Sequence, residues 1–144
     1  MQTFLPYTSF EQTMRVLDPK RLGNQIYREA LTLVRGGWSS HPASLMWKGY
    51  EWHLCDYALA GLRELHLRKA IKQDRIFAHV HTFREIQKQH EKTEVPYWLG
   101  NEDFHASHRS NLLRKDPVYY GQFGWAEPDD LPYVWPKPRE DIDV

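Results

Sequence analysis

The chain has 144 residues, 41% of them hydrophobic and 26% charged, which is enough for one domain of residues 1–144 with its own core. Its formal net charge is zero, which argues against a general nucleic-acid coat protein. No apolar run approaches the ~18 residues of a membrane span, and the first residues do not resemble a signal peptide. A single cysteine, Cys55, rules out an internal disulfide, so we expect a cytoplasmic protein without a membrane partner.

Two helices are predicted at the start of the chain. Thr8 and Glu11 resemble a capping box and predict a short helix over about 9–16. Asp18 is a good N-cap residue, and the proline after it is a good first helical residue. Two successive glycines then end a second helix predicted over about 19–35.

The second helix carries an acidic side chain at the boundary of its apolar face. At 100° per residue, one broad face gathers the apolar residues Leu22, Ile26, Tyr27, Ala30, Leu31, Leu33 and Val34. The opposite, solvent face gathers Arg21, Asn24, Gln25, Arg28 and Thr32. Glu29 lies at the edge between the two faces. Such a carboxylate is a candidate catalytic acid or base, although structural ion pairs produce the same pattern.

Three further helices follow. Apolar residues recur at helical spacing over about 42–70 and predict a long central helix, within which Gly49 and Gly61 are weak points or sites of close packing. A more polar, peripheral helix is predicted over about 75–91, and another over about 102–115 with Asn101 as its N-cap. The lone cysteine lies in the apolar run of the central helix and is expected to be a buried structural thiol.

The C-terminal part of the chain is rich in proline and aromatic residues. We expect an ordered, extended strap over the core, with a strap and tail covering about 126–144 and an acidic, frayed end. The motif LPYVWPKP would alternatively bind a partner as a polyproline II helix. Strand-like alternation is absent almost everywhere, so the predicted fold is all-α and compact, with a single domain.

Polar and aromatic residues near the last predicted helix leave two interpretations open. One interpretation is an edge that contacts phosphate or bases, formed by His105, His108, Arg109 and Asn111. The other is that His108 and Asn111 bind loop carbonyls. The two histidines lack an obvious third ligand, so we expect no metal. Tyr119 and Tyr120 either stack on an extruded base or pack under the strap.

Three blocks of this sequence resemble pyrimidine-dimer DNA glycosylases of the phage endonuclease V type. The run YRE at 27–29 resembles the helix that carries the family's catalytic glutamate, and HPASLMW at 41–47 is similar to the start of its second helix. Residues 105–125 are similar to its last helix and aromatic tail. The motifs LPY, VLDxxRLGxQ, HPxxxMW, SHRxxLLxKDPxxY and LPYVWP are similar to those of a bacterial and phage branch.

This resemblance implies a compact helical monomer that needs no metal or cofactor. Its N-terminal α-amine would attack C1′ of a damaged nucleotide, form a Schiff base, and cut the strand by β-elimination at the abasic site. By position, Glu29 would be the catalytic acid and base and Arg28 a phosphate ligand. The implied partner is damaged or modified double-stranded DNA.

The sequence departs from the family pattern in three respects. Residue 2 is Gln2, which ordinarily protects the initiator methionine, so the nucleophilic amine would belong to Met1. Thr32 replaces an arginine one turn after the glutamate. The chain is neutral where the characterised enzyme is basic, so weaker non-specific DNA binding is expected.

The predicted function is therefore a DNA glycosylase with abasic-site lyase activity on damaged or modified pyrimidines. A nucleic-acid-binding protein that has lost the chemistry, and an enzyme acting on free nucleotides or nucleosides, are the alternatives. Besides the two catalytic groups, the predicted DNA contacts are Lys20, Arg21, Gln25, Arg28, His105, His108, Arg109, Asn111 and Lys115, with Tyr119 and Tyr120 as base-stacking candidates.

Overall fold

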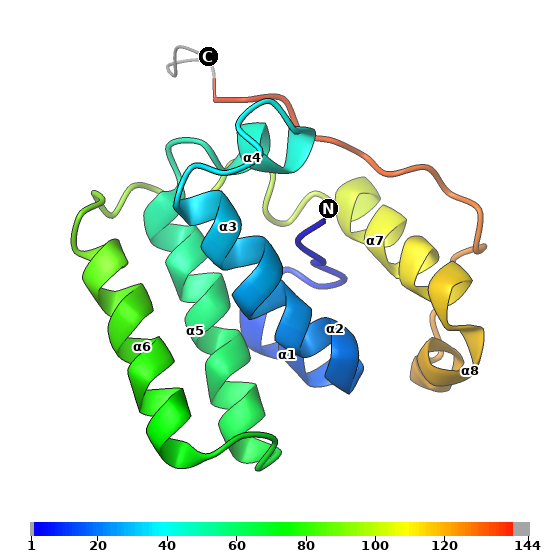
Figure 1. The fold of residues 1–144 in the computed structure, drawn as a ribbon. Helices are drawn as coiled ribbons and strands as arrows, with labels where there is room; N and C mark the ends of the chain where they lie inside the picture. Colours follow the sequence, from blue (N-terminus) through cyan, green and yellow to red (C-terminus); the bar gives the residue numbers. More distant parts are fainter. Residues whose placement is uncertain (1, 140–144) are drawn as a thin grey trace.

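The computed structural model describes residues 2–139, and within that range it is all-helical with no strand, which confirms the predicted fold class (Figure 1). The helices in chain order are α1 (Phe10–Val16), α2 (Pro19–Asn24), the π-helix η1 (Gln25–Ala30), α3 (Leu31–Val34), α4 (Pro42–Trp47), α5 (Glu51–Leu67), α6 (Gln73–Gln87), α7 (Glu102–Lys115), α8 (Pro117–Tyr120) and the 3-10 helix η2 (Gly121–Phe123). None of these helices is long and apolar enough to cross a lipid bilayer.

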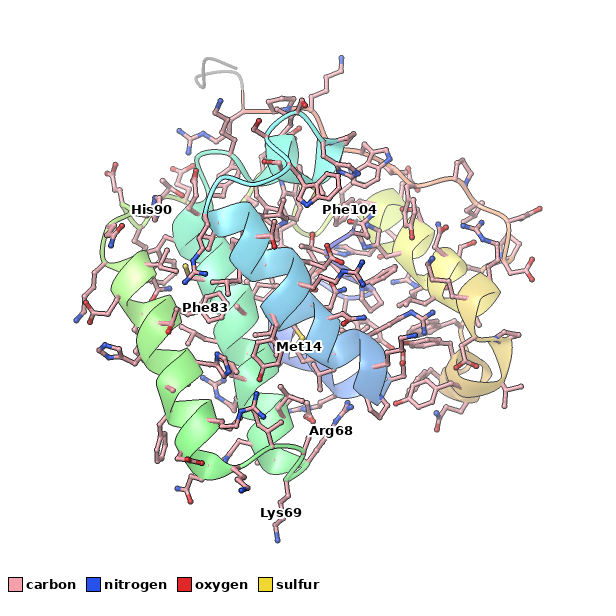
Figure 2. The ribbon with its side chains drawn as sticks, in the orientation of Figure 1. Met14, Arg68, Lys69, Phe83, His90 and Phe104 are labelled. Atoms are coloured by element: carbon pink, nitrogen blue, oxygen red, sulfur yellow. The ribbon has the colours of Figure 1, made fainter. Side chains whose placement is uncertain are left out.

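Helix α5 lies at the centre of the fold. It contacts α1, α2, η1, α3 and α6, and α6 runs alongside it on one side (Figure 1). Met14 of α1 and Phe83 of α6 are both buried in the core cluster that α5 organises (Figure 2). Full burial of side chains of this size contributes about 1.5–3 kcal/mol each. The predicted central position of this helix and its buried cysteine, Cys55, are confirmed.

The predicted continuous helix over 42–70 is wrong, because the chain leaves the helical conformation between α4 and α5. Lys48 has an extended ψ of 124°, and Gly49 has a φ of +86°, a left-handed conformation that favours glycine. Gly61 is instead a site of close packing. A Cβ atom there would lie 2.7 Å from Cγ1 of Ile26, so α5 and η1 approach more closely than a larger residue allows.

The helix predicted to begin after Asp18 is confirmed, but its middle is a π-helix. The Asp18 side chain accepts a hydrogen bond from the Arg21 amide at 3.3 Å, and α2, η1 and α3 follow one another without a break. In η1 the backbone bonds reach five residues back, as from the Leu31 amide to the Ile26 carbonyl. The wider turn shifts the faces assigned at 100° per residue. Gln25, predicted on the solvent face, is only 2% exposed, because the first residues of the chain cover it and its side-chain oxygen accepts from the Phe4 amide at 2.7 Å.

Two predicted helix starts are tested by their caps. The first helix is confirmed, but its N-cap is Ser9 rather than Thr8, because the Ser9 hydroxyl accepts a hydrogen bond from the Gln12 amide at 3.2 Å. Helix α7 begins as predicted, with the Asn101 side chain accepting from the Phe104 amide at 3.1 Å. Helix α6 starts and ends a few residues earlier than its predicted range.

The chain after α7 is helical at first and extended later. Asp116 caps α8 by accepting from the Tyr119 amide at 3.1 Å, so the segment before η2 does not belong to the extended tail. Residues 124–139, here called the strap, contain no helix and run along α7 toward α4 (Figure 1). Ser107 fixes this course by accepting from the Val134 amide at 3.2 Å. The acidic end predicted to fray, residues 140–144, lies outside the described residues.

Candidate active site

The chain begins with an extended segment that runs through the interior. Residues 2–6, here called the N-terminal segment, are all buried although they form no helix. Figure 1 shows the first residues between the α2–η1–α3 helix and α7. An extended segment in a protein core must find partners for its backbone groups among its neighbours. The backbone of this segment is hydrogen-bonded on one side by η1 and α5 and on the other side by α7.

Side chains from η1, α4 and α5 hold one side of the N-terminal segment. Gln25 Oε1 accepts from the Phe4 amide at 2.7 Å, and the Tyr57 hydroxyl lies 2.8 Å from both Gln25 Oε1 and the Phe4 carbonyl. The Trp47 indole donates to the Thr3 hydroxyl at 2.9 Å. Gln25, predicted as a phosphate contact, is thus buried with its oxygen fully occupied by the fold.

Helix α7 holds the other side with its histidines. His105 donates through Nδ1 to the Leu5 carbonyl at 2.7 Å and accepts through Nε2 from the Gly100 amide at 2.9 Å. Nδ1 of His108 accepts from the Leu5 amide at 2.8 Å, which leaves its proton on Nε2. Both rings are buried. Their predicted position on a ligand-facing edge is therefore wrong, because the backbone of the N-terminal segment covers that face of α7.

Arg109 and Asn111 are also interior residues. The Arg109 guanidinium donates to the Pro6 carbonyl at 2.7 Å and to Glu127 at 2.8 Å, and it also pairs with Glu102. Asn111 donates to the Leu131 carbonyl at 3.1 Å, which confirms the alternative prediction that it binds a loop carbonyl. These two side chains join α7 to the N-terminal segment and to the strap, so neither presents a free edge to DNA.

The buried His108 ring makes the stability of the fold sensitive to acid. Burial lowers the pKa of His108 from 6.5 to about 3, so the folded ring stays neutral where the unfolded ring gains a proton. The unfolded state binds more protons between these two pKa values. The free energy of unfolding is therefore expected to be unaffected by this group above pH 6.5. It is expected to fall by up to about 1.4 kcal/mol per pH unit as the pH drops from 6.5 toward 3.

Urea unfolding of the wild-type protein and of His108→Gln at pH 7 and pH 5 measures this effect. The glutamine oxygen can still accept a hydrogen bond, but it does not titrate, so the variant is expected to lose less stability over this interval. Parallel pH profiles for the two proteins would assign the acid sensitivity to other groups.

A cavity of about 270 Å³ opens where the N-terminal segment, α2, η1, α7 and the strap meet. Its lining residues are Gln2, Phe4, Arg21, Asn24, Gln25, Glu29, Lys115 and Tyr133. The structure thus brings together four predicted site residues from two distant parts of the chain. Sequence patterns missed Gln2, Phe4 and Tyr133 because long-range packing alone places them here. Asn24 could have been found as a polar neighbour on the helix that carries Glu29.

Two polar atoms of this cavity are buried without a partner among the described residues. They are Oε2 of Glu29 and Nε2 of Gln2. Burial raises the pKa of Glu29, and the positive charge of Arg28 opposes that shift. Buried polar atoms are normally hydrogen-bonded, so an unpaired carboxylate oxygen and an unpaired amide nitrogen in one cavity are candidate ligand contacts. A carboxyl group with a raised pKa is also suited to proton transfer near neutral pH.

Two cationic side chains line this cavity, and two more are exposed on the helices that contribute to it. Arg21 lines it while also pairing with Asp18 at 3.1 Å, and Lys115 lines it as an exposed residue at the end of α7. Lys20 and Arg28 are exposed on α2 and η1, as predicted. The site is therefore an acid-bearing cavity with cations at its edge, an arrangement suited to an anionic ligand.

The two tyrosines proposed to stack on a base have different environments. Tyr120 is fully buried: its hydroxyl donates to Asp18 Oδ1 at 2.5 Å, and its ring stacks on Trp125 with centroids 5.7 Å apart. The base-stacking prediction is thus wrong for Tyr120, and the alternative, packing in the interior, is confirmed. Tyr119 is half-buried beside the Phe123 ring.

The described residues also form a second cleft and contain several side chains of the types that bind metals. A larger cleft of about 710 Å³ lies between Tyr50, Tyr97 and the end of the strap, but no predicted site residue lines it. Among residues 2–139, no group of three or more histidine, cysteine, aspartate or glutamate side chains is arranged to hold a metal ion. Met1, the predicted nucleophile, lies outside the described residues.

Comparison with known proteins gives one match. The sequence model of a family described as pyrimidine dimer DNA glycosylase matches residues 1–78, just over half of the chain. The matched range includes the N-terminal segment, α2 and η1 with Glu29, and the start of α6. No curated protein and no solved structure matches the chain.

Proposed function

Because the chain belongs to the family of pyrimidine dimer DNA glycosylases, we propose that it is a DNA glycosylase with abasic-site lyase activity on damaged or modified pyrimidines. The proposed catalytic groups are the α-amine of Met1 and the carboxyl group of Glu29. The observation that carries the proposal is the course of the N-terminal segment. Its buried hydrogen bonds bring Gln2, the neighbour of Met1 in sequence, into the cavity that Glu29 lines.

The proposed reaction begins with attack of the neutral amine on C1′ of the damaged nucleotide. An α-amine has a reference pKa near 8, so an appreciable neutral fraction exists at pH 7. The C1′–N bond to the base breaks and the base departs with the proton that the attacking amine gives up. The sugar ring then opens as its oxygen is protonated, and an imine joins C1′ to the amine. Removal of a proton from C2′ then expels the 3′ phosphate oxygen by β-elimination. Water finally hydrolyses the imine and frees the enzyme.

Glu29 is assigned the proton transfers of this sequence. In its protonated form it donates to the sugar ring oxygen as the ring opens, and as a carboxylate it removes the C2′ proton. Its partly buried position and raised pKa support this double role, because both forms are then populated closer to neutral pH. The unpaired amide nitrogen of Gln2 is available to donate a hydrogen bond to a substrate oxygen in the same cavity.

The proposed phosphate contacts are the cations around the cavity: Lys20, Arg21, Arg28 and Lys115. Arg28 is exposed and makes no side-chain hydrogen bond or ion pair with the other described residues, so its replacement should affect binding without affecting folding. Arg28→Gln is expected to weaken duplex binding for all sequences alike and to reduce the slope of log affinity against log salt by about 1.

Fluorescence anisotropy at several salt concentrations measures this slope. Arg84→Gln on α6 is the matched control, since Arg84 is exposed on a helix that contributes nothing to the cavity. Equal slopes for the wild-type protein and Arg28→Gln would remove Arg28 from the proposed DNA surface.

Borohydride trapping on duplexes that carry an abasic site or a pyrimidine dimer tests the proposed function. The protein must keep its native N-terminus, and a version with a Gly-Ser extension before Met1 is the control. The expected result is a covalent adduct that mass spectrometry maps to the first residue, with little adduct from the extended protein. Adduct on the abasic duplex alone would support the lyase reaction and leave another base as the substrate. The absence of any adduct from a folded sample would contradict the amine mechanism.

A further inference from the structure

An exposed tryptophan projects from the loop between α3 and α4. Trp38 is 62% exposed, and its φ of +55° is a left-handed conformation that is uncommon for a bulky residue. Both properties are unfavourable for folding: the indole gains little burial, and the backbone adopts a conformation that suits glycine better. Strained backbone positions cluster at functional sites, so this side chain is a candidate for a contact outside the fold.

The loop holds Trp38 in a fixed position. The Trp38 carbonyl accepts from the His41 amide at 2.9 Å, and the Gly37 amide donates to the Thr32 carbonyl at 2.9 Å. A Cβ atom on Gly37 would lie 2.6 Å from Cγ2 of Thr32, so the loop packs tightly against the end of α3. Thr32, which replaces a family arginine, thereby supports the loop. The indole projects from a closed turn and needs little ordering when it binds a partner.

A line of aromatic rings connects Trp38 to the cavity. Its indole packs edge-on against His41 at 6.4 Å between centroids, and His41 packs edge-on against Trp135 of the strap at 5.6 Å. Trp135 in turn lies 5.5 Å from Tyr133, which lines the cavity beside Glu29. The exposed indole therefore lies at the end of a row of contacting aromatic rings that begins in the candidate active site.

We propose that Trp38 is a wedge that inserts between base pairs of a bound duplex next to the nucleotide held in the Glu29 cavity. This inference rests on the proposed function. An enzyme that acts on C1′ within a duplex must unstack the target nucleotide, and an inserted apolar side chain fills the space and stabilises the kinked DNA. An indole is the largest side chain available for such stacking.

The surroundings of Trp38 favour DNA over a protein partner. Arg35, Ser39 and Ser40 are its exposed neighbours in the loop, so polar and cationic groups flank the exposed part of the indole. A stable protein interface would require a larger, more continuous apolar area. A single planar ring next to an arginine matches a base stack flanked by phosphates.

The test uses a duplex that contains a non-reactive tetrahydrofuran abasic analogue with 2-aminopurine as the adjacent base. Wild-type protein is expected to raise the 2-aminopurine fluorescence as the base unstacks. Trp38→Ala is expected to lose this rise and to bind the duplex roughly tenfold more weakly, while Trp38→Phe retains most of both effects. Phe77→Ala is the matched control, since Phe77 is 60% exposed on α6, which contributes nothing to the cavity.

A second substrate separates this proposal from the proposed function. Borohydride trapping on a single-stranded abasic oligonucleotide needs the amine chemistry but no unstacking of a duplex. Trp38→Ala is therefore expected to form as much covalent adduct on this substrate as the wild-type protein. Loss of trapping by the wild-type protein, with its fluorescence rise intact, would overturn the lyase function and support the wedge. The wedge would be overturned if Trp38→Ala kept the full fluorescence rise. It would also be overturned if the variant lost equal amounts of trapped adduct on single-stranded and duplex DNA.

Discussion

Glu29→Gln is expected to reduce strand cleavage at an abasic site by about 10²–10⁴-fold while leaving the affinity for the duplex unchanged. Glutamine keeps the shape of the side chain and its place in η1, but it can neither donate a proton to the sugar ring nor remove one from C2′. Single-turnover cleavage of an abasic duplex, measured beside anisotropy titrations, separates the chemical step from binding.

Glu29→Gln also has an expected effect on stability that an ordinary structural glutamate would not show. Burial raises the pKa of Glu29, which means that the fold disfavours its charged form. Removing the charge should therefore leave the free energy of unfolding unchanged or increase it. Glu85→Gln, an exposed change on α6, is the control for cleavage. A variant at Glu29 that cleaves normally, or that loses cleavage only because it unfolds, would contradict the assigned role.

Arg109→Met is expected to lower the free energy of unfolding by about 3–5 kcal/mol, the largest stability effect predicted for a single residue of this fold. Arg109 is buried and joins three parts of the chain through Pro6, Glu102 and Glu127. Methionine preserves much of the volume but leaves the Pro6 carbonyl and the carboxylate of Glu127, itself largely buried, without their donor.

Guanidinium unfolding at pH 7 measures this loss. Arg63→Met is the matched control, because Arg63 pairs with Glu11 in an ion pair whose side chains are both more than half exposed, and such pairs contribute about 0–1 kcal/mol. Equal losses for the two variants would show that Arg109 contributes only as an ordinary surface arginine does.

The sequence predicted helices well where local chemistry decides them. Asp18 with its following proline and Asn101 mark two helix starts that the structure confirms, since a cap depends on residues a few positions away. Gly49 was recognised as a weak point, but its left-handed φ, which separates α4 from α5, could not be read from the apolar pattern.

The site was harder to predict because long-range packing creates it. Periodicity shows which residues share a face, but it does not show what covers that face. The polar residues of α7 therefore resembled a ligand-binding edge, although the N-terminal segment and the strap cover them. Gln25 was misplaced for the same reason, because the N-terminal segment covers it and binds it through the Phe4 amide. The partly buried position of Glu29 was predicted correctly, because a position at the edge of an apolar face depends mainly on the helix itself.

The anchoring of the N-terminal segment has a consequence for synthesis on the ribosome. Leu5 and Pro6 bind His108 and Arg109, each 103 positions later in the chain. The N-terminal segment is translated long before α7 and therefore acquires these native partners only after that helix has been synthesised. Contacts of such high sequence separation form late and slow the overall folding rate. A nascent chain should thus carry an unassembled cavity until α7 leaves the exit tunnel, and pulse-labelling of ribosome-bound chains halted before and after α7 would detect that transition.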